Sequence, residues 1–178
     1  DPFLVYVNRA GAWTLTENES FCEAELATAP GHSFLPWCAE LPRRRDADIY
    51  FPILHGPNGE DGRMQGLFEL AGRPFVGAGS LPAQLAMDKV TAKMLFAQAG
   101  LEQAPFVFFR ENIPEQIAEL SEKKLGYPVF VKPSSLGSSV GIRKAADRAD
   151  LLAAADLAFA YDAKIVVEKA VAMREIEV

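Results

Sequence analysis

The feature that most constrains the fold is a lysine-bearing strand that runs directly into a glycine- and serine-rich loop, over residues 128–142. Alternating apolar residues before Lys132 predict an extended segment. The loop at 133–141 offers unobstructed backbone N–H groups and two hydroxyls, which are the donors that a phosphate needs. With the cation of Lys132 at its mouth, we interpret the loop as a phosphate cradle. On the loop alone, a hairpin connection that binds nothing stays open as the alternative.

Two familiar phosphate-binding motifs do not fit this chain. A Walker A loop places its lysine after the glycines and continues into a helix, whereas Lys132 precedes them and a strand follows. Gly77 and Gly79 resemble the start of a dinucleotide-binding turn, but Pro82 stands where a third glycine would let a helix pack closely. The sequence therefore predicts neither a P-loop nor a Rossmann fingerprint.

The net charge and the cysteine content restrict the class of protein to which the chain can belong. Eighteen basic against 24 acidic residues give a formal charge of −6, and the basic residues are scattered apart from Arg43–Arg45, which argues against a nucleic-acid partner. Cys22 and Cys38 lie far from other candidate ligands, and this predicts free thiols and no metal site. Neither a membrane-length apolar run nor a signal peptide is seen, so we expect a cytoplasmic protein without membrane contact.

The first hundred residues show an order of elements typical of a parallel sheet. Residues 3–15 predict a hairpin. A strand at 49–54, a helix from 64 closed by Gly72, a short strand at 74–77 and a helix at 80–100 then follow in β-α-β-α order. Such an order favours an α/β arrangement.

The remainder of the chain has a different pattern. A helix at 113–125 leads into the Lys132 strand, and a strand at 140–144 follows the loop. Asp147 is a predicted N-cap for a helix that ends near residue 159, before a last strand at 163–168. We expect an α+β subdomain with an antiparallel sheet, and a boundary near 101–105. Both ends of the chain interrupt strand-like sequence, so natural sequence is expected to be missing on either side.

Several separated motifs follow one another in an order that matches one family. They are His55–Gly62, Gln65–Gly66, Gly72–Gly77, Ala86–Lys89, Ala99–Leu101, Val131–Pro133, Gly137–Gly141, Val167–Lys169 and Arg174–Glu177. With these motifs the chain resembles the D-alanine:D-alanine ligases, which are ATP-grasp enzymes, from about residue 49 to its end. An ordered set is far more specific than any single loop.

The resemblance implies a cytoplasmic Mg2+- or Mn2+-dependent ligase that is usually a homodimer. It would spend ATP to phosphorylate one D-alanine carboxylate, and the amine of a second D-alanine would attack the acyl phosphate. The product is the dipeptide of peptidoglycan, which serves cell-wall biogenesis and cell shape. Residues 1–100 would then be part of the N-terminal substrate-binding domain, and 101–178 a truncated central ATP-grasp subdomain.

The resemblance also implies which residues hold the nucleotide. Lys89 and Lys132 would approach the phosphates, although Lys89 by itself reads as a solvated helix lysine. Glu168 would accept from the exocyclic amine of adenine, while the backbone at Lys169 and Val171 contacts the ring edge. Glu175 would hold the ribose hydroxyls. Exposed strand-end carboxylates in surface pairs are the alternative for such residues.

Substrate positions follow in the same way. Gly137 belongs to the nucleotide loop, Ser138 would position the substrate, and the Ser139 backbone would lie near the reacting phosphate. His55 would lie at the first D-alanine pocket, although a lone loop histidine is more often structural. Asp61 is interpreted as a helix N-cap and not as a metal ligand.

Parts of the family pattern are absent from the chain. The glycine-rich loop with its amine-binding glutamate does not precede residue 1, and the lid, the arginine and the magnesium ligands would follow residue 178. We therefore expect no metal ligands here and little or no catalysis by these 178 residues alone. A D-alanine:D-lactate ligase and a non-catalytic nucleotide-binding module of ATP-grasp fold remain alternatives.

Overall fold

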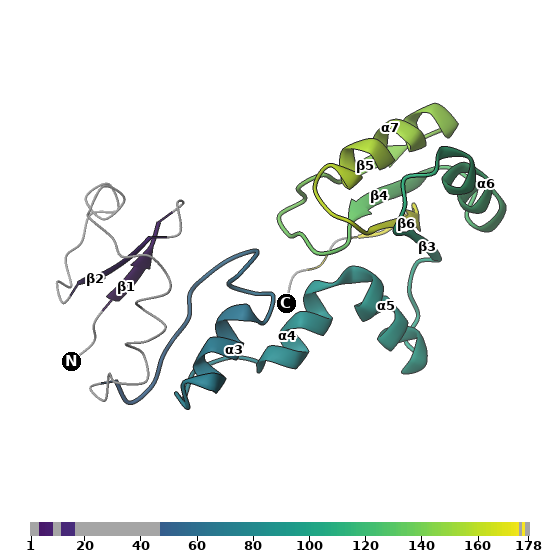
Figure 1. Cartoon of the computed structure of the whole chain (residues 1–178). Coiled ribbons are helices and arrows are strands. Elements are labelled where there is room, and N and C mark those ends of the chain that lie inside the picture. The colour runs from purple at the N-terminus through teal and green to yellow at the C-terminus, as the bar shows by residue number, and fades with distance from the viewer. Residues whose placement is uncertain (1–3, 9–11, 17–46, 175, 177–178) are drawn as a thin grey trace. The chain divides into compact units, whose positions relative to one another are not determined.

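The computed structural model describes residues 4–8, 12–16, 47–174 and 176 (Figure 1). The chain divides into two compact units, Asp1–Pro52 with Leu67–Gly77, and Ile53–Gly66 with Ala78–Val178. The predictions made for Cys22, Cys38 and Glu175 lie outside the described residues. No helix of the described part has the length and apolar character that crossing a membrane requires.

In the first unit, the predicted hairpin is confirmed and the predicted strand at 49–54 is wrong. Strands β1 (Leu4–Val7) and β2 (Trp13–Thr16) pair antiparallel. At Tyr50 a single parallel bridge to Phe75 forms, and it does not grow into a ladder. Pro52 explains the difference, because it has no N–H to donate to a neighbouring strand. The Phe68 ring stacks on Tyr50 at 4.9 Å between centroids and packs on Phe75 at 5.4 Å.

Helix α3 (Arg63–Leu70) begins where predicted. The Asp61 carboxylate accepts from the N–H of Arg63, the first helical residue, at 3.3 Å. After the helix, Gly72 adopts a left-handed φ of 63°, a conformation that ends helices at little cost in glycine. The role expected for Gly72 is confirmed, whereas Asp61 lies one residue before the N-cap position of α3 and binds the first helical N–H from there.

The helix predicted at 80–100 is in fact two helices, α4 (Ser80–Met87) and α5 (Lys89–Gln98). Asp88 breaks the run with extended backbone (φ −81°, ψ 102°), and its side chain accepts from the N–H of Thr91 at 2.9 Å, so it is the N-cap of α5. The apolar spacing of the sequence also predicts that Met94 and Leu95 face inward, and this prediction is wrong, because both are 47% exposed.

The second unit is built on a four-stranded antiparallel sheet. Its order is β3-β6-β4-β5, with β3 at Phe106–Phe109, β6 at Ile165–Lys169, β4 at Val129–Pro133 and β5 at Arg143–Ala145. This confirms the predicted antiparallel sheet. Strand β3 is the element that the sequence analysis does not anticipate, because its four consecutive apolar residues show no alternation.

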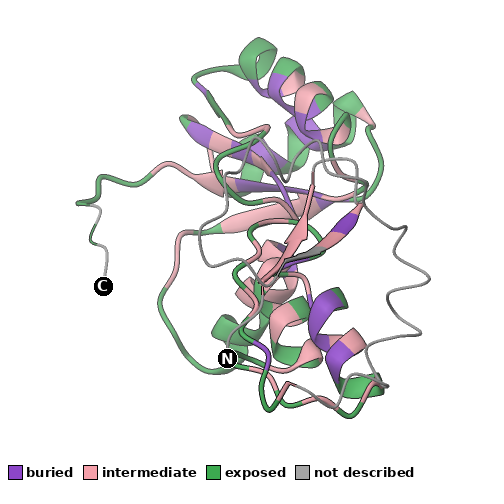
Figure 2. Ribbon diagram, turned by 90° about the vertical axis from the view of Figure 1, so that its left-hand side faces the viewer, coloured by how far each residue is buried: buried purple, intermediate pink, exposed green. Residues whose placement is uncertain are grey.

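Two helices cover one face of this sheet, here called the packed face. Helices α6 (Pro114–Lys124) and α7 (Arg148–Phe159) both agree with the prediction, and the Asp147 carboxylate caps α7 by accepting from the N–H of Asp150 at 2.9 Å. The core between helices and sheet is purple in Figure 2 and comprises Phe109, Ile117, Val129, Val131, Ala145, Leu151, Ala154, Ala155, Ala158, Ile165 and Val167.

The other side of the sheet, here called the open face, has a different composition. Alternation along β4 turns Phe130 and Lys132 away from the core that holds Val129 and Val131. Helix α5 lies on this side and contacts β6, whereas α7 lies on the packed face (Figure 1). The fold thus places a lysine-bearing helix opposite a lysine-bearing strand.

Candidate functional site

Three charged side chains meet on the open face, and we call them the lysine–glutamate cluster: Lys93 of α5, Lys132 of β4 and Glu168 of β6. The Glu168 carboxylate lies 2.6 Å from Lys132 Nζ and 3.3 Å from Lys93 Nζ. The Glu168 and Lys93 side chains are 12% and 14% exposed, while that of Lys132 is 24% exposed. Two cations therefore share one carboxylate, which leaves a net positive charge suited to an anion.

Aromatic rings lie beside this cluster. Phe106 and Phe130 both stand opposite Glu168 in the strand register. Lys93 Nζ lies 5.0 Å from the Phe106 ring centroid, and the ammonium groups of Lys132 and Lys144 each lie 5.9 Å from that of Phe130. Cations over ring faces are favourable contacts. An apolar surface edged by cations can hold a planar ring that carries an anionic tail.

A second group of contacts fixes the start of α5. The Lys164 ammonium forms an ion pair with the Asp88 carboxylate, to which Ser134 Oγ also donates at 3.0 Å. The N–H of Lys89 donates to the Ser134 carbonyl at 2.9 Å. Burial raises the pKa of Asp88, but hydrogen bonds from Lys164, the N–H of Thr91 and Ser134 outweigh it and lower the pKa to about 2. Asp88 therefore ties α5 to the segment that follows β4.

The ammonium group of Lys89 lies against the glycine-rich loop. It donates to the carbonyl of Leu136 and, at 3.5 Å, to that of Ser134. Burial lowers the pKa of Lys89, and repulsion from Lys132 lowers it further, against attraction by Glu168. An anion bound between Lys89 and Lys132 would relieve that repulsion.

The loop itself is held at both ends and exposed at its tip. At its start, the N–H of Ser135 donates to the Asp162 carboxylate at 2.6 Å. At its end, a Cβ on Gly141 would lie 2.8 Å from Pro133 Cγ and 2.9 Å from Tyr161 Cδ2, so the backbone packs where no side chain fits. Between these points, residues 137–140 are exposed.

The tip of the loop has an unusual backbone. Ser138 and Ser139 adopt left-handed φ angles of 49° and 58°, which cost energy in residues other than glycine and recur at ligand sites. Within the part of the chain that the structure describes, the N–H groups of Gly137, Ser138 and Ser139 donate to no protein acceptor. The tip can therefore offer them to a ligand.

The remaining predicted nucleotide residues lie at and beyond the end of β6. The N–H of Lys169 donates to the Pro105 carbonyl at 2.9 Å, and its ammonium donates to that of Tyr127 at 2.9 Å. Val171 follows the strand and is 49% exposed. The structure brings Lys89, Lys132 and Glu168 together, with Lys169 and Val171 continuing the strand of Glu168.

The predicted substrate residue His55 stands apart from these contacts. It is exposed, at the start of the loop 55–62, and among the described residues no hydrogen bond or ion pair joins it to the lysine–glutamate cluster. The loop is internally braced: the N–H of Gly56 donates to the Glu60 carboxylate, and Gln65 Nε2 donates to the Gly59 carbonyl at 2.8 Å. The role expected for His55 stays a prediction.

Sequence reasoning missed Lys93, Lys164 and the two phenylalanines. Two signals could have found some of them. Lys93 follows Lys89 by four residues and so shares its side of a helix. Phe130 precedes Lys132 by two residues and so shares its face of a strand.

Two other features bear on function. Among residues 4–8, 12–16, 47–174 and 176, no group of three or more His, Cys, Asp or Glu side chains could hold a metal ion.

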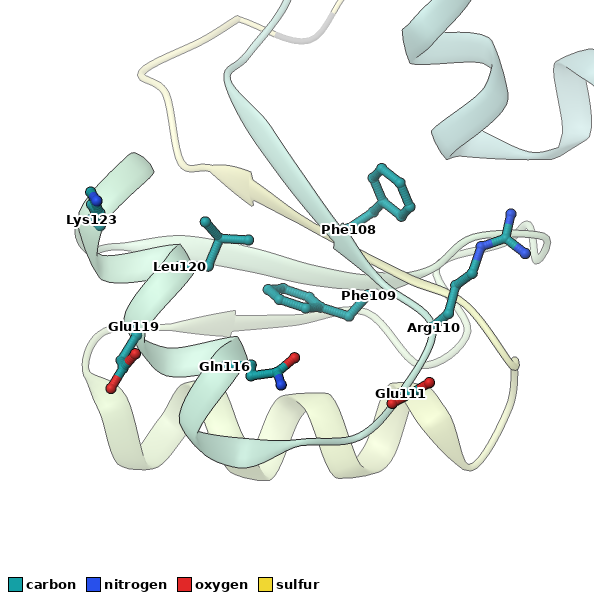
Figure 3. Close-up of a pocket in the computed structure, with 8 residues that line it drawn as sticks. All are labelled: Phe108, Phe109, Arg110, Glu111, Gln116, Glu119, Leu120 and Lys123. Carbon is teal, nitrogen blue, oxygen red and sulfur yellow. The ribbon is translucent and has the colours of Figure 1, made fainter.

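Figure 3 shows an open groove elsewhere in the second unit, between β3 and α6, and none of the predicted site residues lines it. Its lining includes Phe108, Phe109, Arg110, Gln116, Glu119 and Leu120.

Comparison with known proteins gives consistent matches along the chain. A family model described as "D-ala D-ala ligase N-terminus" matches residues 1–78, and one described as "D-ala D-ala ligase C-terminus" matches residues 95–178. A D-alanine–D-alanine ligase of Heliobacterium modesticaldum is 53% identical over 97% of this chain and 51% of the relative. One of Bacillus velezensis is 45% identical over 98% of this chain and 54% of the relative. The chain thus spans about half the length of the curated relatives it matches.

Solved structures agree with this assignment. The VanG D-Ala:D-Ser ligase of Enterococcus faecalis superposes with a TM-score of 0.76 at 32% identity, over 94% of this chain and 52% of that one. The D-alanine–D-alanine ligase of Coxiella burnetii superposes with a TM-score of 0.75 at 25% identity, over 96% of this chain and 54% of that one. The predicted ATP-grasp fold class is therefore confirmed.

Proposed function

Because the chain belongs to the D-alanine–D-alanine ligase family, we propose that it supplies the nucleotide site of an enzyme that joins two D-alanine molecules with ATP for peptidoglycan synthesis. The observation that carries the proposal is the convergence of Lys89, Lys132 and Glu168 beside a loop with unpaired N–H groups. That convergence supplies the charge such a reaction needs.

The phosphate end of ATP is assigned to Lys89, Lys132 and the loop tip. A carboxylate is a poor electrophile, and it repels a triphosphate, so positive charge must lie where the phosphoryl group transfers. Lys89 and Lys132 repel each other in the ligand-free protein, and a triphosphate would remove that repulsion. The exposed N–H groups at Gly137 and Ser139 add donors for the transferring phosphoryl group.

The base end is assigned to the end of β6. Glu168 would accept from the exocyclic amine of adenine, with the backbone at Lys169 and Val171 along the ring edge. The neighbouring Phe106 and Phe130 rings support this assignment, because a purine packs well on aromatic surfaces. Glu175 is assigned to the ribose hydroxyls.

The substrate end is assigned to Ser138 and His55. The Ser138 hydroxyl would position the D-alanine whose carboxylate is phosphorylated, and His55 would lie in the first D-alanine pocket. When bound, Mg2+ or Mn2+ would neutralise phosphate charge and polarise the transferring group. We further propose a cytoplasmic homodimer, with residues 1–100 in the substrate domain and 101–178 in the central nucleotide subdomain.

The direct test is phosphate release from ATP by the full-length protein. We expect release that depends on D-alanine and yields the dipeptide, and we expect the 178 residues alone to give little or none. No D-alanine-dependent release from the full-length protein would overturn the proposal. Release by the short chain would overturn only the expectation that the family's remaining segments are needed for catalysis.

Two measurements together distinguish a ligase from a module that only binds nucleotide. ATP should raise the thermal unfolding temperature of the wild type and fail to do so in Lys132→Ala, because the cation beside the phosphates is lost. The matched control is Lys124→Ala on the exposed end of α6. ATP protection without dipeptide formation by the full-length protein would favour the binding module.

The second substrate needs its own comparison. The similarity to a D-Ala:D-Ser ligase is a reason to assay D-serine beside D-alanine and D-lactate. An amine must be deprotonated to attack, so ligation of D-alanine should rise toward alkaline pH, whereas a hydroxy acid has no such amine. Preference for D-lactate at low pH would replace the proposed substrate.

A further inference from the structure

Lys93 is held at several points on the open face. Its ammonium contacts the Glu168 carboxylate at 3.3 Å, the Phe106 ring at 5.0 Å and Gln103 Oε1 at 3.4 Å. Gln103 also donates through Nε2 to the backbone carbonyl of Lys93 at 2.7 Å, so the Gln103 side chain binds both the ammonium group and the backbone of Lys93. A long side chain fixed at several points keeps its position when a neighbour moves.

Lys132 differs from Lys93 in the exposure of its side chain and in the element that carries it. Its side chain is the more exposed of the two, at 24% against 14%. It also belongs to the strand that enters the glycine-rich loop. Besides its contact with Glu168, the Lys132 ammonium lies 5.9 Å from the Phe130 ring centroid, farther than Lys93 lies from that of Phe106. Lys132 is therefore the partner of Glu168 that a bound anion can draw away.

Glu168 would then depend on its second partner. Its side chain is 12% exposed, and a carboxylate this buried is costly to leave without a cation. Lys93 approaches one carboxylate oxygen, Oε1, while Lys132 approaches the other, Oε2. If Lys132 turns to phosphate, Oε2 is released as an acceptor while Lys93 still holds Oε1.

We propose that Lys93 is a positioning residue that fixes the Glu168 carboxylate against a bound purine, so that its free oxygen selects a 6-amino group over a 6-oxo group. The proposal rests on the proposed function, because it concerns the same nucleotide site. A fixed carboxylate accepts from an amino group and repels a carbonyl oxygen. A carboxylate that can turn away discriminates less.

The test compares ATP with inosine triphosphate, which carries oxygen in place of the 6-amino group. Dissociation constants are measured by titration calorimetry on the full-length protein. In Lys93→Met we expect ATP to bind about tenfold more weakly and the ratio of the two constants to fall about fivefold. Lys93→Arg, which keeps the charge, should recover most of the selectivity.

Two further variants keep the test informative. Lys124→Met, on the exposed end of α6, should leave both constants unchanged. Gln103→Leu removes the residue that holds Lys93 without touching Glu168, and it should lower the selectivity in the same direction but less. This second variant decides the question if Lys93→Met fails to fold.

The outcomes separate the inference from the function on which it rests. Equal weakening of both nucleotides in Lys93→Met, with the ratio unchanged, would show a merely structural lysine and would overturn the inference alone. Wild-type protein that binds no ATP would remove the proposed function and this inference with it.

Discussion

The two faces of the four-stranded sheet are made by alternate residues of the same strands, yet they differ in kind. On β6, Ile165 and Val167 enter the hydrophobic core under α6 and α7. The next residue, Glu168, turns to the other face, where its carboxylate pairs with two lysines. The packed face holds the fold together, whereas the open face keeps charges close and available.

The difference teaches where stability and binding reside. Apolar burial contributes to folding without regard to ligand. A partly buried ion pair contributes little net stability, because desolvation offsets much of the attraction. Substitutions on the packed face should therefore change unfolding first, and substitutions on the open face should change nucleotide affinity first.

The largest effect is expected on the packed face. Ile165→Ala removes a side chain with 0% exposure and leaves a cavity, so the free energy of unfolding should fall by about 3–4 kcal/mol. Urea denaturation measures this loss. A loss below about 1 kcal/mol would mean that this face is not closely packed, and the contrast between the faces would disappear.

Lys132→Met tests the open face. We expect kcat/KM for ATP in the full-length protein to fall about 100-fold, equivalent to about 2.7 kcal/mol, while unfolding changes by less than about 1 kcal/mol. Steady-state kinetics and urea denaturation on the same preparation measure both. The matched control is Lys124→Met, which removes an exposed lysine at the end of α6. Equal losses in both variants would contradict a specific role for Lys132.

Gly141→Ala should have an intermediate effect that touches both properties. The new Cβ would meet Pro133 and Tyr161 below 3.0 Å, and the left-handed φ of 71° adds strain. We expect about 1–2 kcal/mol lower stability and weaker ATP binding, because the loop must shift. The control is Gly100→Ala, which has a similar left-handed φ of 74° but nothing within 4 Å of the added methyl, and which lies outside the proposed nucleotide site. If the two variants had the same stability and the same ATP affinity, close packing at Gly141 would not be what fixes the end of the loop.

The smallest effect is expected from Asp88→Asn, which keeps an N-cap but loses the charge facing Lys164. The folded-state pKa of Asp88, about 2, lies below its ordinary value of 3.8, so its stabilisation is present above pH 3.8 and disappears as the pH falls toward 2. The side chain keeps solvent contact, so screening limits the difference at neutral pH to about 1 kcal/mol. Urea denaturation from pH 7 to pH 2 should show the two proteins converging. A constant difference would contradict the charge pair as its cause.

The sequence could predict what local pattern determines. Asp147 before an apolar helix and alternation around Lys132 are short-range signals, and the cap and both faces of β4 follow from them. The ordered motifs identified the family and hence predicted that Lys89, Lys132 and Glu168 belong to one site, and the structure shows that the three side chains interact.

What escaped prediction depends on residues far apart in the chain. The break at Asp88 accompanies its ion pair with Lys164, 76 residues away. Strand β3 becomes recognisable by its pairing with β6, and Lys93 joins the site only because β6 brings Glu168 beneath α5. No short window of sequence contains such contacts.

The position of two lysines on α5 has a further consequence. Lys89 and Lys93 are four residues apart on a single ten-residue helix, so their backbones are separated by about 6 Å along its axis. The two side chains therefore extend from one element, Lys89 to the glycine-rich loop and Lys93 to Glu168. Their spacing of four residues keeps both contacts on one side of the helix, and inserting one residue between the two lysines would turn Lys93 by about 100° away from its carboxylate.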